Sequence, residues 1–85
     1  MQIMNEMDDM AAFTTKRVVE YMEMLHISVN KLQQDTGVAR STITRYMHGT
    51  TMPSLYFLGK FLNYIEVDAA EFYEPYVVNK KKFVS

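Results

Sequence analysis

Several residue types and patterns are missing from this chain of 85 residues, and each absence removes a class of protein. There is no cysteine, which excludes thiolate zinc sites and thiol catalysis and agrees with a reducing compartment. No apolar run approaches the roughly 18 residues of a membrane span. The N-terminal stretch "MQIMNEMDDM" is acidic, whereas a signal peptide begins with basic residues. We therefore expect a cytoplasmic protein with no membrane partner.

Signatures of catalysis are missing as well. The three glycines form no phosphate-binding loop, there is no nucleophile elbow, and no carboxylate pair or histidine–acid pair falls on one predicted face. The two histidines, His26 and His48, stand apart from acidic residues and make no metal site. We expect no enzyme activity, no metal and no other cofactor. The 48% hydrophobic content is instead enough for one compact core without a staple.

The charge is small but unevenly distributed. A net charge of −1 argues against a uniformly basic nucleic-acid binder. Residues 28–52 nevertheless carry more basic than acidic side chains, namely Lys31, Arg40 and Arg45 against Asp35. The segments 1–12 and 53–74 carry an acidic excess, and the chain closes with Lys80–Lys82. Within the central region, residues 28–52 are therefore the one positive part.

Apolar periodicity and capping residues divide most of the chain into helices. The predicted helices are 14–25 with Thr14 or Thr15 as N-cap, Ser28 to Gly37, 39–48 closing on Gly49, 55–65, and a very short 69–73 that Asp68 caps and Pro75 ends. Glycine suits the two helix ends because it adopts the left-handed conformation at little cost. The sequence predicts an all-α domain of four to five helices over 14–74, with an N-terminal extension over 1–13 and a basic tail over 75–85. Its predicted core is Val19, Met22, Leu32, Val38, Ile43, Leu55, Leu58, Leu62, Ile65 and Phe72.

Two of these helices are joined by a short turn containing glycine, which is the arrangement of a helix-turn-helix. Leu32, Val38, Ile43 and Tyr46 are the apolar residues that must converge between them. The turn "TGV", the run "RSTITRY", Gly49, "PSL" and "VDAAEF" follow one another from about Val18 to Tyr73. In this order they resemble the Cro/phage-repressor type of helix-turn-helix, the XRE family of bacterial and phage transcription regulators.

The resemblance implies a compact lambda-repressor-like fold and a sequence-specific transcriptional regulator. Such a protein would be a bacterial or phage repressor that reads the major groove of an operator with helix 39–48. The residues implied to contact base edges are Arg40, Ser41, Thr44 and Arg45. Arginine has two parallel donors that match O6 and N7 of guanine, so the half-site is expected to contain guanine.

Phosphate contacts are implied at a second set of polar residues, Ser28, Thr42, His48, Thr50 and Thr51. Ser28 and His48 could instead have a purely structural role. Ser28 is also an N-cap, and a histidine is favourable at the C-terminal end of a helix. The sequence departs from the family's pattern at several positions, and these departures reduce the number of phosphate contacts that we expect. Many members have glutamine where Val29 stands, where it braces a base-reading side chain, and a basic residue often follows the glycine that ends the helix. Glu66 replaces a glycine often seen between the fourth and fifth helices, which predicts either strain at that joint or a cap shifted by one residue.

The resemblance also bears on partners. One recognition helix buries little surface, so we expect a homodimer on an inverted repeat. The candidate interface residues are Tyr64, Phe72 and Tyr73. The alternative is a protein-interaction module of the same fold, as in antitoxins, anti-defence proteins and adaptors, and a regulatory protein partner is a further candidate. The near-zero net charge and the missing phosphate-contacting residues favour this alternative.

Overall fold

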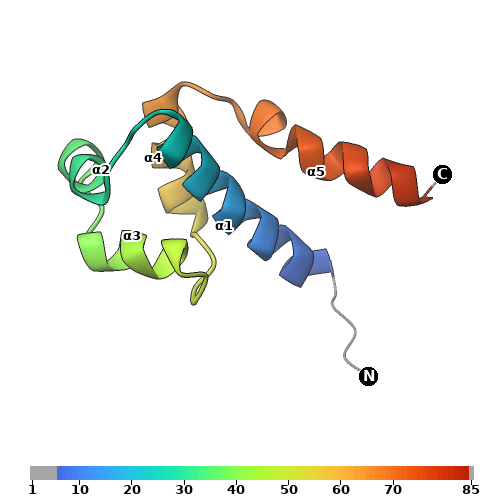
Figure 1. Cartoon of the computed structure of the whole chain (residues 1–85), viewed down its shortest axis with the longest axis horizontal. Helices are drawn as coiled ribbons and strands as arrows, with labels where there is room; N and C mark the ends of the chain where they lie inside the picture. The colour runs from blue at the N-terminus through green and yellow to red at the C-terminus, as the bar shows by residue number, and fades with distance from the viewer. Residues whose placement is uncertain (1–5, 85) are drawn as a thin grey trace.

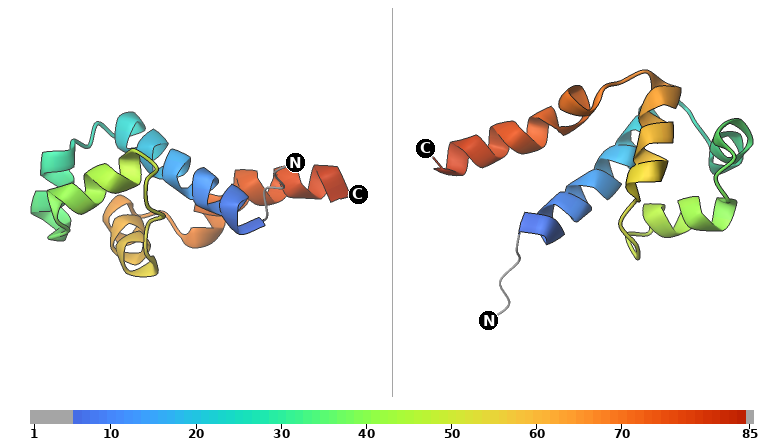
Figure 2. Two further views of the ribbon diagram at one scale, coloured as in Figure 1. Left: turned by 90° about the horizontal axis from the view of Figure 1, so that it is seen from below. Right: turned by 180° about the vertical axis from the view of Figure 1, so that it is seen from behind.

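Five helices make up the described part of the chain, and it contains no strand. The structure is a computed structural model that describes the backbone of residues 6–84 and the side chains of residues 9–78. The helices are α1 (Glu6–Met24), α2 (Val29–Thr36), α3 (Arg40–Met47), α4 (Leu55–Ile65) and α5 (Ala69–Val84). In Figures 1 and 2, α2, α3 and α4 cluster around one end of α1, while α1 and α5 extend to the other side. The predicted all-α class is confirmed.

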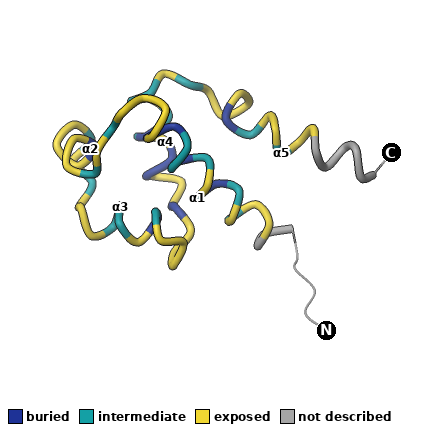
Figure 3. Tube along the Cα trace, in the orientation of Figure 1, coloured by how far each residue is buried: buried dark blue, intermediate teal, exposed yellow. Residues whose placement is uncertain are grey.

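The core lies where α1, α2, α3 and α4 meet, and α5 closes it (Figure 3). Its buried hydrophobic residues are Val18, Tyr21, Met22, Leu32, Ile43, Tyr46, Phe57, Leu58, Phe61 and Phe72. Five of the ten predicted core residues are in this set, and Val19, Val38, Leu62 and Ile65 are only partly buried. Leu55 was predicted wrongly, because it is 86% exposed at the start of α4.

Most of the predicted caps are confirmed. The Ser28 side chain accepts a hydrogen bond from the Lys31 N–H at 3.0 Å, and Asp68 Oδ1 accepts one from the Glu71 N–H at 2.8 Å. Gly37 and Gly49 both have the predicted left-handed conformation, with φ of 79° and 75°. These local signals therefore fix both ends of α2 and the C-terminal end of α3.

The N-terminal bound of α1 differs from the prediction. The helix begins at Glu6, so Thr14 lies in its interior and is not an N-cap. Thr14 is fully buried, and its hydroxyl donates to the Met10 carbonyl at 2.7 Å. The same oxygen lies 2.6 Å from the hydroxyl of Tyr73 on α5. Thr14 is thus a buried link between α1 and α5.

The predicted end of the fifth helix at Pro75 is also wrong, because α5 continues through this residue to Val84. Proline normally breaks a helix because it lacks an N–H and its ring meets the preceding turn. Here α1 holds the helix on both sides of the proline. The Arg17 Nε donates to the Phe72 carbonyl at 3.0 Å, and the rings of Phe13 and Tyr76 lie 5.2 Å apart. The side chains of the predicted basic tail at residues 80–82 lie outside the described part.

Candidate nucleic-acid interface

Helix α3 is fixed across α2 by a small apolar junction. Leu32 and Ile43 are fully buried there, Tyr46 is buried, and Val38 packs against the same cluster. The predicted convergence of these residues is therefore confirmed. The ring of Tyr46 also lies 4.8 Å from that of Phe57, which ties α3 to α4. One side of α3 is thus held by the core, and the opposite side is left to solvent.

The solvent side of α3 carries the residues predicted to contact bases. Arg40, Ser41 and Arg45 are exposed, and Thr44 is half-buried. Positions 40, 41, 44 and 45 lie on one side of a helix because they are spaced by about one turn. The structure therefore brings these four side chains together on one outward face of α3, which we call the α3 face.

The residues predicted to contact phosphate are in less uniform surroundings. Ser28 caps α2 as an acceptor, so its own hydroxyl proton is still available to donate. The Thr50 hydroxyl donates to the Arg45 carbonyl at 3.1 Å and would have to exchange this partner for a phosphate. His48 is exposed at the C-cap of α3, Thr51 is exposed and Thr42 is half-buried.

An unpredicted contact joins the two helices of the motif. The Arg40 Nη1 donates a hydrogen bond to Asn30 Oδ1 in the first turn of α2. The preceding residue, Val29, is half-buried and packs against the core. The one sequence signal for this contact was an asparagine in the first turn of a helix, where it contributes little to helix propensity.

Asp35, the acidic residue of the otherwise basic segment, is engaged by neighbouring side chains. Its Oδ2 accepts from the Tyr64 hydroxyl at 2.5 Å and lies 3.3 Å from the Lys31 Nζ. The Tyr64 hydrogen bond, followed by Lys31, holds the pKa of Asp35 below its ordinary value of 3.8, and the same bond raises the pKa of Tyr64 above 10.0. Because Asp35 and Lys31 largely offset each other, the net positive charge of the segment comes from Arg40 and Arg45.

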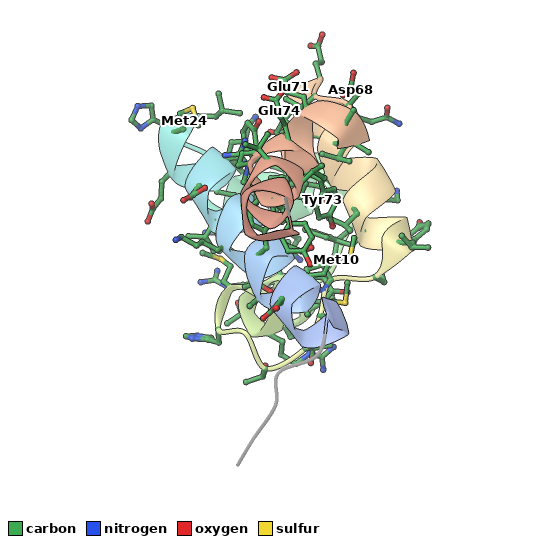
Figure 4. All side chains as sticks on the ribbon, turned by 90° about the vertical axis from the view of Figure 1, so that its right-hand side faces the viewer. Met10, Met24, Asp68, Glu71, Tyr73 and Glu74 are labelled. Carbon is green, nitrogen blue, oxygen red and sulfur yellow. The ribbon has the colours of Figure 1, made fainter. Side chains whose placement is uncertain are left out.

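Acidic side chains gather at the end of the molecule away from α3. Asp68, Glu71 and Glu74 are exposed around the start of α5, where Figure 4 shows them together at the top of the view. Like charges repel the phosphate backbone, so this end is unfavourable for nucleic acid. The distribution of charge therefore points the α3 face, and not the start of α5, toward a polyanion.

The three predicted interface residues do not form one exposed surface. Phe72 is completely buried and offers no contact to a partner, so its place is in the core. Tyr73 is half-buried against α1 through Thr14 and Phe13, and Tyr64 is half-buried at the α2–α4 joint. Among the side chains of α5 that the structure describes, the large apolar residues that are exposed are Val77 and Val78, at 45% and 46% exposure.

A five-helix, all-α domain whose second and third helices form a helix-turn-helix is the class that this geometry defines. Residues 18–72, more than half of the chain, match a family model described as helix-turn-helix, and the chain belongs to this family, of the XRE type. The family is one of DNA-binding regulators, and it is not typically enzymatic. No curated protein and no solved structure matches the chain. None of the described helices has the length and apolar character needed to cross a membrane.

Proposed function

We propose that this chain is a sequence-specific transcriptional repressor, of bacterial or phage type, that reads the major groove of operator DNA through α3. The observation that carries the proposal is the α3 face, where two exposed arginines and an exposed serine lie opposite the buried Ile43 and Tyr46. A side chain reads a base reliably only when the helix that carries it is rigidly placed. The buried junction with α2 supplies that placement.

The chemistry of the α3 face suits guanine and thymine. Each arginine can donate two hydrogen bonds to O6 and N7 of guanine, and the hydroxyls of Ser41 and Thr44 can contact neighbouring bases or a thymine methyl. The hydroxyl proton of Ser28 and the backbone N–H groups at the start of α2 would hold a phosphate. Thr42, His48, Thr50 and Thr51 are further phosphate candidates. Phosphate contacts fix the register, and base contacts then provide the selectivity.

We further propose that two copies bind an inverted repeat whose half-sites lie about one helical turn apart. The exposed Val77 and Val78 on α5, with the edge of Tyr73, are the surface that we assign to this dimer. This surface belongs to the helix that extends away from α2 and α3 (Figure 1), so pairing would leave both α3 faces free. Analytical ultracentrifugation with and without operator tests it. A single copy that stays single on its operator would contradict the proposal.

The decisive experiment separates reading from electrostatic attraction. A cognate duplex is first selected from a random pool, and the affinities of Arg40→Ala and Arg45→Ala are then measured on cognate and scrambled duplexes at two salt concentrations. Loss of a bidentate contact should cost about 1–3 kcal/mol on the cognate duplex and relax the preference at one base position. Lys16→Ala, which removes an exposed charge from α1, is the control and should affect both duplexes equally. If the arginine variants lose equal affinity for the cognate and scrambled duplexes, α3 holds the DNA but does not read its sequence.

One observation favours the second candidate, a protein-interaction module. Exposed apolar side chains cluster in sequence just after α3, with Leu55 at 86%, Tyr56 at 72% and Met52 at 44% exposure. Exposed apolar patches are typical of protein–protein contacts. If the intact protein binds none of the selected duplexes, this candidate replaces the repressor.

A further inference from the structure

We propose that Asn30 is a positioning residue for Arg40 and thereby sets how strictly the operator base beneath Arg40 is read. The inference rests on the proposed function, since it concerns how the same face reads DNA. It starts from the hydrogen bond that Arg40 Nη1 donates to Asn30 Oδ1 across the two helices of the motif.

The local structure leaves Asn30 free for this role. Ser28 caps α2, so the Asn30 side chain is not needed to satisfy the helix N-terminus. Asn30 is the second residue of α2, and no hydrogen bond from its side chain to the backbone of the helix is needed there because Ser28 already caps it. The preceding residue, Val29, packs against the core and is not available to contact Arg40. The next residue along the helix, Asn30, is the one that reaches Arg40.

The hydrogen bond also dictates the orientation of both groups. A guanidinium only donates, so the asparagine must present its carbonyl oxygen to Arg40 and turn its NH₂ group away. Only one of the five guanidinium N–H groups is needed for this bond, and the remaining donors can still form a fork toward a guanine. An exposed arginine otherwise samples many rotamers, and this freedom is lost on binding. Asn30 restricts Arg40 before the DNA arrives.

Asn30 also lies beside Lys31, whose Nζ is 3.3 Å from Asp35 Oδ2. The neighbouring charge of α2 is thus already offset, and no carboxylate of this helix competes with Asn30 for the guanidinium in the described structure. A neutral acceptor holds an arginine more weakly than a carboxylate would. Arg40 is therefore oriented without being neutralised, and its charge stays available to the DNA.

The test measures base preference at the position read by Arg40, using the selected duplex and its three single-base variants. Asn30→Ala should reduce the discrimination among these four duplexes by about three- to ten-fold, in line with one hydrogen bond, and should leave discrimination at the other positions unchanged. Asn30→Asp keeps the acceptor oxygen, so it should retain the discrimination while it weakens binding to all four duplexes through its negative charge. Asn63→Ala, at an exposed asparagine on α4, is the matched control and should change neither quantity.

The same measurement in an Arg40→Ala background decides the mechanism. If Asn30 acts through Arg40, the further change to Asn30→Ala/Arg40→Ala should have no added effect on discrimination. Unchanged discrimination in Asn30→Ala alone, or an equal effect with and without Arg40, overturns the inference while the repressor proposal stands. Absence of any selective binding by the unmodified protein overturns both. Circular dichroism and the melting temperature, which should be unchanged because both side chains are exposed, confirm that each variant is folded.

Discussion

Two helix ends in this fold are strained, and exchanging residues there gives a sharp test of its stability. His26 after α1 and Glu66 after α4 have φ of 57° and 59°, in the left-handed region. This conformation costs a residue other than glycine about 1–2 kcal/mol. Glycine adopts it without this cost, but its greater freedom in the unfolded chain lowers the stability of the folded state by about 0.5–1 kcal/mol. Glu66→Gly should therefore stabilise the domain by about 0.5–1 kcal/mol, which raises the melting temperature of a domain this size by about 2–8 °C.

The reverse substitution, from glycine to alanine, can be made at Gly37 and Gly49, which have similar positive φ. A Cβ added at either position meets no atom within 4 Å, so alanine there should cost only the backbone term, about 0.5–1 kcal/mol. Glu66→Gln controls for the charge near the C-terminal end of α4, because it removes the carboxylate without relieving the backbone. Thermal unfolding followed by circular dichroism measures all four variants. If Glu66→Gly gains no more than Glu66→Gln, the argument from backbone strain is refuted.

Two further predictions concern the packing of α2. Ile43→Ala, at a fully buried residue of the α2–α3 junction, should cost about 2–5 kcal/mol in urea unfolding, and a loss well below 1 kcal/mol would contradict a tightly packed junction. Asp35 has a folded pKa below 3.8, so its contribution to stability is present above that pH and is lost as the pH falls through the lowered pKa. Tyr64→Phe removes the main cause of the shift and should flatten the acid part of a plot of melting temperature against pH, whereas an unchanged plot would show that the bond contributes nothing.

The helix-turn-helix could be predicted because its local signals agree with one another. Ser28 and Gly37 bound α2 by capping chemistry that needs no tertiary partner, and Leu32 and Ile43 are the apolar positions that the motif must bury. In α4 the apolar pattern is less informative, because the run "LYFLGKFLNYI" has apolar residues on nearly every side of the helix. The sequence therefore does not determine which side of α4 faces the core. Phe57 and Phe61 are buried, whereas Leu55 and Leu62 were expected to be.

Contacts between distant segments explain the other differences. Pro75 is a helix breaker by local rules, but the packing of Phe72, Tyr73 and Tyr76 on α1 outweighs its cost. At the candidate site, the spacing of residues along one helix was enough to predict which side chains share the α3 face. The hydrogen bond from Arg40 to Asn30 could not, because it depends on how closely two helices approach each other.

The way α5 is attached gives the helix two unequal parts. Up to Tyr76 it is held by a buried phenylalanine, by the Arg17 hydrogen bond and by ring contacts with α1, whereas Val77 and Val78 beyond it are close to half exposed. Opening the helix at Val77 and Val78 exposes little additional apolar surface from these two side chains, so the free energy of opening there is far smaller than that of the whole domain. We expect the amide hydrogens of Val77 and Val78 to exchange by local fraying, and those around Phe72 to exchange only when the domain unfolds. A helix that is continuous in shape is thus expected to have two parts of unequal stability, with the boundary just after Tyr76.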